Sequence, residues 1–147
     1  MTIMAFRRDI TTLLVVAGLL FMAGCAETRH HVASGSRITL GGAEEVPPVV
    51  TTASGSGTIT VGSDRSVSGS ITTSGVAGLA AHIHEGARGT NGPVIVPLIK
   101  STDNVWSVPP GASLTDSQYA SYKAGNLYVN VHSAANKGGE IRGQLRP

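Results

Sequence analysis

The chain has 147 residues, with 11 Lys and Arg, nine Asp and Glu, and a single cysteine. A formal charge of +2 gives no indication of nucleic-acid binding, and one cysteine cannot form an intrachain disulfide. The 19 glycines favour strands joined by tight turns over long helices. Stability must therefore come from a core of aliphatic side chains, which a domain of about 110 residues is large enough to form.

The N-terminus carries the features of an export signal. Arg7 and Arg8 precede an apolar run over residues 13–23, which is shorter than the roughly 20 residues of a membrane-spanning helix and is typical of a signal peptide. The run leads into Met22-Ala23-Gly24-Cys25, which resembles the lipobox of bacterial lipoproteins. We expect a lipoprotein signal peptide over residues 1–24 and lipidation of Cys25. The alternative is an ordinary signal peptide.

These features predict an exported protein that is anchored by lipid in the cell envelope. In a Gram-negative host it would lie at the outer membrane or in the periplasm. Its predicted partner is the membrane, to which the lipid on Cys25 would attach it. Residues 26–36 lack hydrophobic periodicity, so we expect a lipidated tether over residues 25–36. The apolar residues after it are periodic, which favours a folded domain over residues 37–147.

The first half of this domain predicts short strands. Residues 38–40 alternate between apolar and polar side chains, whereas two prolines keep residues 44–49 out of the centre of a sheet. The runs 58–61 and 67–72 indicate a hairpin that turns at residues 62–65. The side chains expected in the core are Ile59, Val61, Val67 and Ile71.

Further strands follow along the chain. We expect a strand over residues 80–84, a glycine-rich loop over 85–92, and a buried strand over 94–99 that Pro97 interrupts. Residues 105–106 indicate another short strand.

One helix precedes the last two strands. Residues 114–125 predict this helix, with Thr115 as N-cap and Gly125 in the left-handed position at its end. The last two strands are expected over 127–133 and 140–145. The predicted fold class is all-β, an antiparallel sandwich or Greek-key-like barrel with one short helix.

Three histidines fall on polar strand faces. Side chains two residues apart on a strand share a face, so His82 and His84 project together while Ile83 faces the core. His132 lies on the polar face of the strand 127–133. If the two strands are neighbours, the three imidazoles would form a copper or zinc site, with ring nitrogens within about 4 Å of one another.

Other polar residues of the last strands are expected to surround these histidines. A metal-bound imidazole usually donates its other N–H to an oxygen. The expected neighbours of the histidines are Asn130, Glu140 and Arg142, and Tyr128 or a water molecule would complete the coordination. A solvated polar face on which the histidines bind nothing shows the same alternation and is the alternative.

No catalytic motif stands out in the sequence. It contains no Gly-x-Ser-x-Gly elbow, no phosphate-binding loop and no His-Glu-x-x-His motif. We therefore name no catalytic residue and do not expect an enzyme.

Five motifs follow one another along the predicted domain. They are Glu44-Glu45-Val46-Pro47-Pro48-Val49, His82-Ile83-His84-Glu85-Gly86, Asn91-Gly92-Pro93-Val94, Leu127-Tyr128-Val129-Asn130-Val131-His132 and Gly138-Gly139-Glu140-Ile141-Arg142-Gly143-Gln144-Leu145. Together they resemble the CHRD domain, which is named for chordin. One departure is Ala135-Asn136-Lys137, where many members have an aromatic residue and a proline. The resemblance covers about residues 37–146 and implies a β domain in a secreted protein.

A weaker similarity runs to the Cu/Zn superoxide dismutase β-sandwich, and it implies copper ligation by three residues. His82, His84 and His132 would match three of that family's four copper histidines, but residues 85–97 contain no fourth. Dismutase activity is therefore not expected, whereas a three-histidine copper or zinc site is.

Two function hypotheses result. One is a metal-binding envelope lipoprotein, and the other is a structural or protein-interaction module that binds no metal.

Overall fold

The computed structural model describes residues 35–147. The predicted signal peptide, Cys25 and almost all of the predicted tether lie outside this range. Between residues 35 and 147, no helix combines the length and the apolar character needed to cross a membrane.

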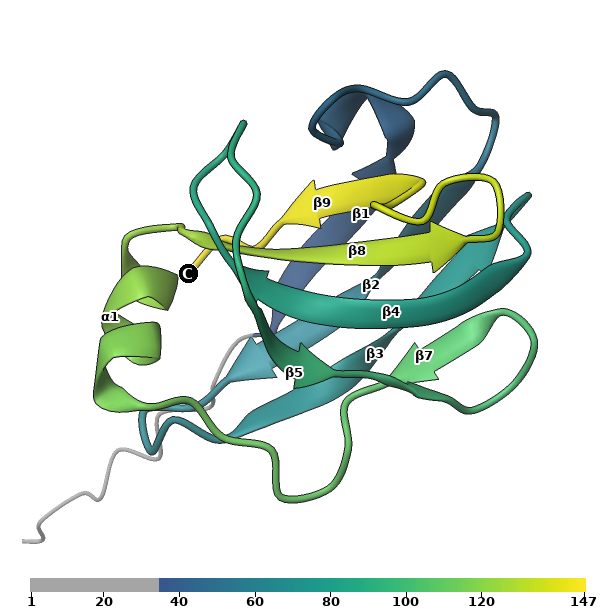
Figure 1. Ribbon diagram of the computed structural model, residues 1–147. Coiled ribbons are helices and arrows are strands. Elements are labelled where there is room, and N and C mark those ends of the chain that lie inside the picture. The colour runs from purple at the N-terminus through teal and green to yellow at the C-terminus, as the bar shows by residue number, and fades with distance from the viewer. Residues whose placement is uncertain (1–34) are drawn as a thin grey trace, which may run out of the picture. The chain divides into compact units, whose positions relative to one another are not determined.

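The described residues form one nine-stranded antiparallel sheet with a short α-helix at one end (Figure 1). The order of the strands across the sheet is β5-β4-β8-β9-β1-β2-β3-β7-β6. The prediction of an all-β antiparallel fold with one short helix is confirmed. The strands are β1 (Ser36–Gly41), β2 (Ser54–Val61), β3 (Val67–Ser74), β4 (Gly78–Glu85), β5 (Val94–Pro97), β6 (Ile99–Lys100), β7 (Val105–Ser107), β8 (Leu127–Ser133) and β9 (Ile141–Gln144), and the helices are the 3₁₀ turn η1 (Gly42–Glu44) and α1 (Asp116–Lys123).

Both edges of the sheet come from one continuous segment. β5 pairs with β4 at one edge, β6 pairs with β7 at the other, and Leu98 alone separates β5 from β6. The Leu98 N–H donates to the Ala81 carbonyl (2.9 Å), and the Lys100 ammonium donates to the Gly78 carbonyl (3.1 Å). These bonds hold the two edges together, so the sheet curls into a nearly closed barrel.

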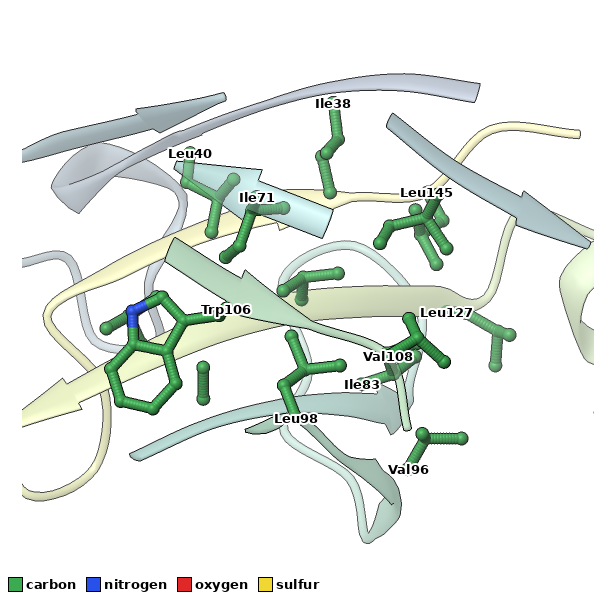
Figure 2. Close-up of a cluster of buried hydrophobic side chains, with 14 of the residues drawn as sticks. Ile38, Leu40, Ile71, Ile83, Val96, Leu98, Trp106, Val108, Leu127 and Leu145 are labelled. Atoms are coloured by element: carbon green, nitrogen blue, oxygen red, sulfur yellow. The ribbon is translucent and has the colours of Figure 1, made fainter. Parts of the chain in front are cut away.

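The core fills the inside of this barrel (Figure 2). Alternate strand residues point inward, as expected for period-two patterning, and Ile59 and Ile71 of the predicted hairpin are fully buried. The expectation of a buried strand over residues 94–99 is wrong in one respect. Val94 and Ile99 are 49% and 51% exposed, because a segment at the edge of a sheet buries only its inward side chains, here Val96 of β5 and Leu98 after it.

The helix packs at one end of the barrel, close to the ends of β4 and β9. Thr115 caps it in a capping box with Gln118, and Gly125 follows it with a φ of 75°. The Ser121 hydroxyl donates to the Glu85 carboxylate at the end of β4 (2.6 Å). The Gln144 amide of β9 donates to the Gly125 carbonyl (2.8 Å). These contacts fix the ends of β4 and β9, two of the strands that carry the polar side chains described next.

A candidate metal centre

Strand pairing brings the three predicted histidines together. β4 and β8 are neighbours, with Ile83 opposite Val129, and both of these side chains point into the core. The alternating side chains of His82, His84 and His132 therefore lie on the outer surface of the barrel. One ligand nitrogen from each lies within 4.8 Å of the others, a slightly wider group than the predicted separation of about 4 Å.

Backbone carbonyls hold two of the imidazoles in place. The Nδ1 atoms of His84 and His132 lie 2.9 Å from the carbonyl oxygens of Gly92 and Lys137, respectively. A carbonyl only accepts, so each Nδ1 carries the proton and each Nε2 keeps its lone pair. The Nε2 atom of His132 lies 3.0 Å from Nδ1 of His82.

Electrostatics favour the neutral, metal-binding form of two histidines. Burial lowers the pKa of His82 and of His84 below the usual value of 6.5, and the neighbouring His132 lowers both further. The hydrogen bond to Gly92 opposes this shift in the pKa of His84. Both imidazoles are therefore neutral near pH 7, the protonation state that a metal ion requires.

The polar surface beside the histidines is buried. Tyr128, Asn130 and Arg142 are each at most 2% exposed. The loop between β4 and β5 contacts Tyr128 and Arg142, and the turn at Gly138 contacts Asn130. The Arg142 guanidinium donates to the Ala87 carbonyl (3.1 Å), and the Gln144 amide donates to the Gly86 carbonyl (2.9 Å). The predicted polar face is thus an interior between the barrel and this loop.

Glu45 adds a carboxyl group to this interior. It is 4% exposed, and burial raises the pKa of its carboxyl to about 7, although the charge of Arg142 lowers it. Gly139 makes room for it, since a Cβ there would lie 2.3 Å from Glu45 Oε1 and 2.6 Å from Asn130 Nδ2. Within residues 35–147, Glu45 Oε1, Asn130 Oδ1 and His84 Nε2 are buried without a hydrogen-bond partner.

The family model of the CHRD domain matches residues 36–145. The chain belongs to the CHRD family. No curated protein and no solved structure matches it. The predicted resemblance is therefore confirmed, and its boundaries agree with the predicted domain to within two residues.

The residues expected around the histidines of this CHRD domain differ in their placement. Asn130 lies opposite His82 on β8 and donates to the Gly138 carbonyl (3.3 Å), and its side chain is close enough to His84 to raise the pKa of that imidazole, so it neighbours the histidines as expected. Arg142 stacks on Tyr128 and touches the covering loop instead of a histidine. Glu140 accepts a hydrogen bond from Thr51 (2.9 Å), and none of its hydrogen bonds reaches a histidine.

Sequence patterns did not identify three features of this centre. The carbonyls that orient His84 and His132 belong to backbone, which every residue has, so no sequence signal marks them. Either Tyr128 or a water molecule was expected to complete the coordination. The Tyr128 ring instead stacks on His84 (4.8 Å between centroids), and its hydroxyl accepts from the Gly92 N–H (3.2 Å). The motif around Glu45 was recognised, but its burial beside Asn130 depends on the fold.

The three histidines of the CHRD domain could hold a metal ion. In a tetrahedral site with bonds of about 2.0–2.1 Å, ligand nitrogens lie about 3.3 Å apart. His82 Nδ1 and His132 Nε2 are close to this separation at 3.0 Å, but His82 Nδ1 donates to His132 Nε2, so its proton must move to Nε2 of the same ring before it can bind a metal. His84 needs a shift of about 1–2 Å. Neutral imidazoles suit zinc and copper alike.

Proposed function

We propose that this CHRD domain binds a copper or zinc ion through His82, His84 and His132. The observation that carries the proposal is the buried Nε2 atom of His84, which has no hydrogen-bond partner within the described residues although two further imidazoles lie beside it. A buried acceptor without a donor costs about 1–3 kcal/mol. A bound cation would remove this cost.

The surroundings support a site with three protein ligands. Gly92 and Lys137 orient His84 and His132 as carbonyl partners usually do in metal sites. His82 and His132 are only partly buried, so water can reach the position that the three imidazoles leave open. We assign no catalytic reaction to this site.

We also propose that the domain works in the cell envelope on a lipid anchor. The support is the sequence: a short apolar run that ends in small residues directly before Cys25. A histidine site outside the cytoplasm would meet metal ions without competition from the cytosolic thiol pool.

The test is a calorimetric titration of the purified full chain with Cu²⁺ and with Zn²⁺. His30 and His31 are adjacent in the sequence and could bind metal by themselves, so the parent protein for the titration is H30A/H31A. We expect one ion per chain in this parent, and a loss of affinity of at least about tenfold in H82A, H84A or H132A, since each removes one of three ligands.

Two outcomes would contradict this proposal. One is that the H30A/H31A parent binds neither metal, and the other is that the three ligand variants bind as tightly as the parent. Either result would favour the alternative, a structural or protein-interaction module of the envelope.

A further inference from the structure

A groove of about 530 Å³ lies over strands β1 and β9 and contains none of the three histidines. Its size is within the roughly 300–1,000 Å³ range of small-molecule sites. Three arginines and one glutamate give it a positive formal charge. The polar side chains that line it are Arg37, Thr39, Glu44, Arg88, Gln144 and Arg146.

One arginine of the groove is neutralised and two are not. Arg88 donates through Nη1 to both carboxylate oxygens of Glu44, at 2.7 and 2.5 Å. Arg37 and Arg146 are exposed, and neither side chain has an ion pair or hydrogen bond with any residue of the range 35–147. Two guanidinium groups in one concavity attract an anion more strongly than isolated surface charges do.

The floor of the groove consists partly of backbone. A Cβ at Gly41 would meet no atom within 4 Å, so this position leaves open space above β1. At Gly143 a Cβ would lie 2.2 Å from the Thr39 carbonyl oxygen, so only glycine allows β9 to approach β1 this closely. Gly41 therefore leaves room for a ligand above β1, and Gly143 keeps β1 and β9 close together beneath the groove.

We propose that this groove binds the phosphate monoester of a larger ligand, a phosphorylated polyol or a lipid headgroup. Guanidinium groups match phosphate oxygens with paired N–H donors. A phosphate monoester carries close to two negative charges near pH 7. These would balance the two positive charges of Arg37 and Arg146. The groove is larger than a phosphate ion alone, which leaves space for the group that carries the phosphate. This proposal does not depend on the metal site.

The test uses the full chain in neutral detergent with EDTA present, so that a metal ion cannot bind the probe. Three probes are compared by calorimetry: inorganic phosphate, glycerol 3-phosphate, and micelles with and without phosphatidic acid. R37Q/R146Q removes both free guanidinium groups. R65Q/K123Q is the matched control, because it makes the same change in net charge at residues that do not line the groove.

We expect R37Q/R146Q to bind glycerol 3-phosphate or phosphatidic acid micelles at least about tenfold more weakly, and R65Q/K123Q to bind within about twofold of the wild type. R37K/R146K keeps the charge without the paired donors and should fall between them. Binding of the micelles alone would assign the phosphate to a lipid headgroup, and binding of glycerol 3-phosphate would show that a soluble ligand suffices. The proposal is overturned if no probe binds, if only inorganic phosphate binds, or if both double glutamine variants lose affinity equally.

Discussion

The guanidinium carbon of Arg142 lies 3.4 Å from the centroid of the Tyr128 ring. The same ring stacks on His84, with planes only 6° apart. β8 lies between β4 and β9 in the sheet, so Tyr128 connects a side chain from each neighbouring strand. Arg142 also bonds the loop that supplies the Gly92 carbonyl to His84. One buried arginine therefore supports the orientation of a candidate ligand without touching it.

Replacing this arginine should destabilise the domain. Arg142→Lys removes the planar donors that reach Ala87 and Asn91 and the stack on Tyr128. We expect the free energy of unfolding to fall by about 2–4 kcal/mol, as for other broken buried charge networks. Urea denaturation measures this change. The control R88K alters an exposed pair and should cost less than about 1 kcal/mol; an equal loss in both variants would contradict the role given to Arg142.

Metal affinity should depend on pH through the histidines. Protons compete with the metal for imidazole nitrogen, so affinity should be level above pH 6.5 and fall at lower pH. Because the pKa values of His82 and His84 lie below 6.5, the fall should begin at lower pH than for a tri-imidazole peptide in solution. Titrations of the H30A/H31A chain between pH 5 and 8 test this, and a decline that matches the free peptide would disprove it.

Glu45 should make stability depend on pH in the opposite sense. Its pKa is raised from 4.5 to about 7 by burial, so the folded state binds more protons than the unfolded state between these values. The Glu45 contribution is therefore present below pH 4.5 and is lost as the pH rises to about 7. Glu45→Gln should remove this loss and leave the variant more stable than the wild type at pH 8, by up to about 3 kcal/mol.

The wild type and E45Q contain the same histidines. The difference between their free energies of unfolding at pH 5 and at pH 8 therefore isolates the effect of Glu45. Glu44→Gln is the control on the adjacent residue, whose carboxylate pairs with Arg88 on the surface. It should change stability by less than about 1 kcal/mol at either pH. A wild type that is more stable than E45Q at pH 8 would contradict the assigned cost of burying this charge.

Lipidation of Cys25 is tested by Cys25→Ser. We expect this variant to accumulate as an unprocessed precursor or to leave the membrane fraction, because the acylated thiol is lost. Fractionation and intact mass spectrometry of the expressed protein measure both effects. Wild-type protein that is wholly soluble, with no acyl mass on residue 25, would show that the motif is not used.

Local patterns were enough to predict most secondary structure. The period-two runs that predicted the hairpin around residues 62–65 correspond to β2 and β3, and Thr115 caps the helix as expected. The same alternation placed His82 and His84 on one face of β4. These predictions succeed because they depend on backbone geometry within a few residues. The prediction of a buried strand over residues 94–99 was wrong because the position of a strand at the edge of a sheet is a property of the whole sheet.

Sequence by itself determined the family, the strand pattern and the three histidines as one candidate group. Only the tertiary structure decided what surrounds them. The alternation that predicts a polar face cannot show that the loop after β4 covers Arg142 or that Glu45 and the turn at Gly138 lie against Asn130, so it cannot show that both side chains are buried. The carbonyls of Gly92 and Lys137, the stack on Tyr128 and the carboxyl of Glu45 come from separate segments. Their positions depend on long-range strand pairing, which no local sequence pattern encodes.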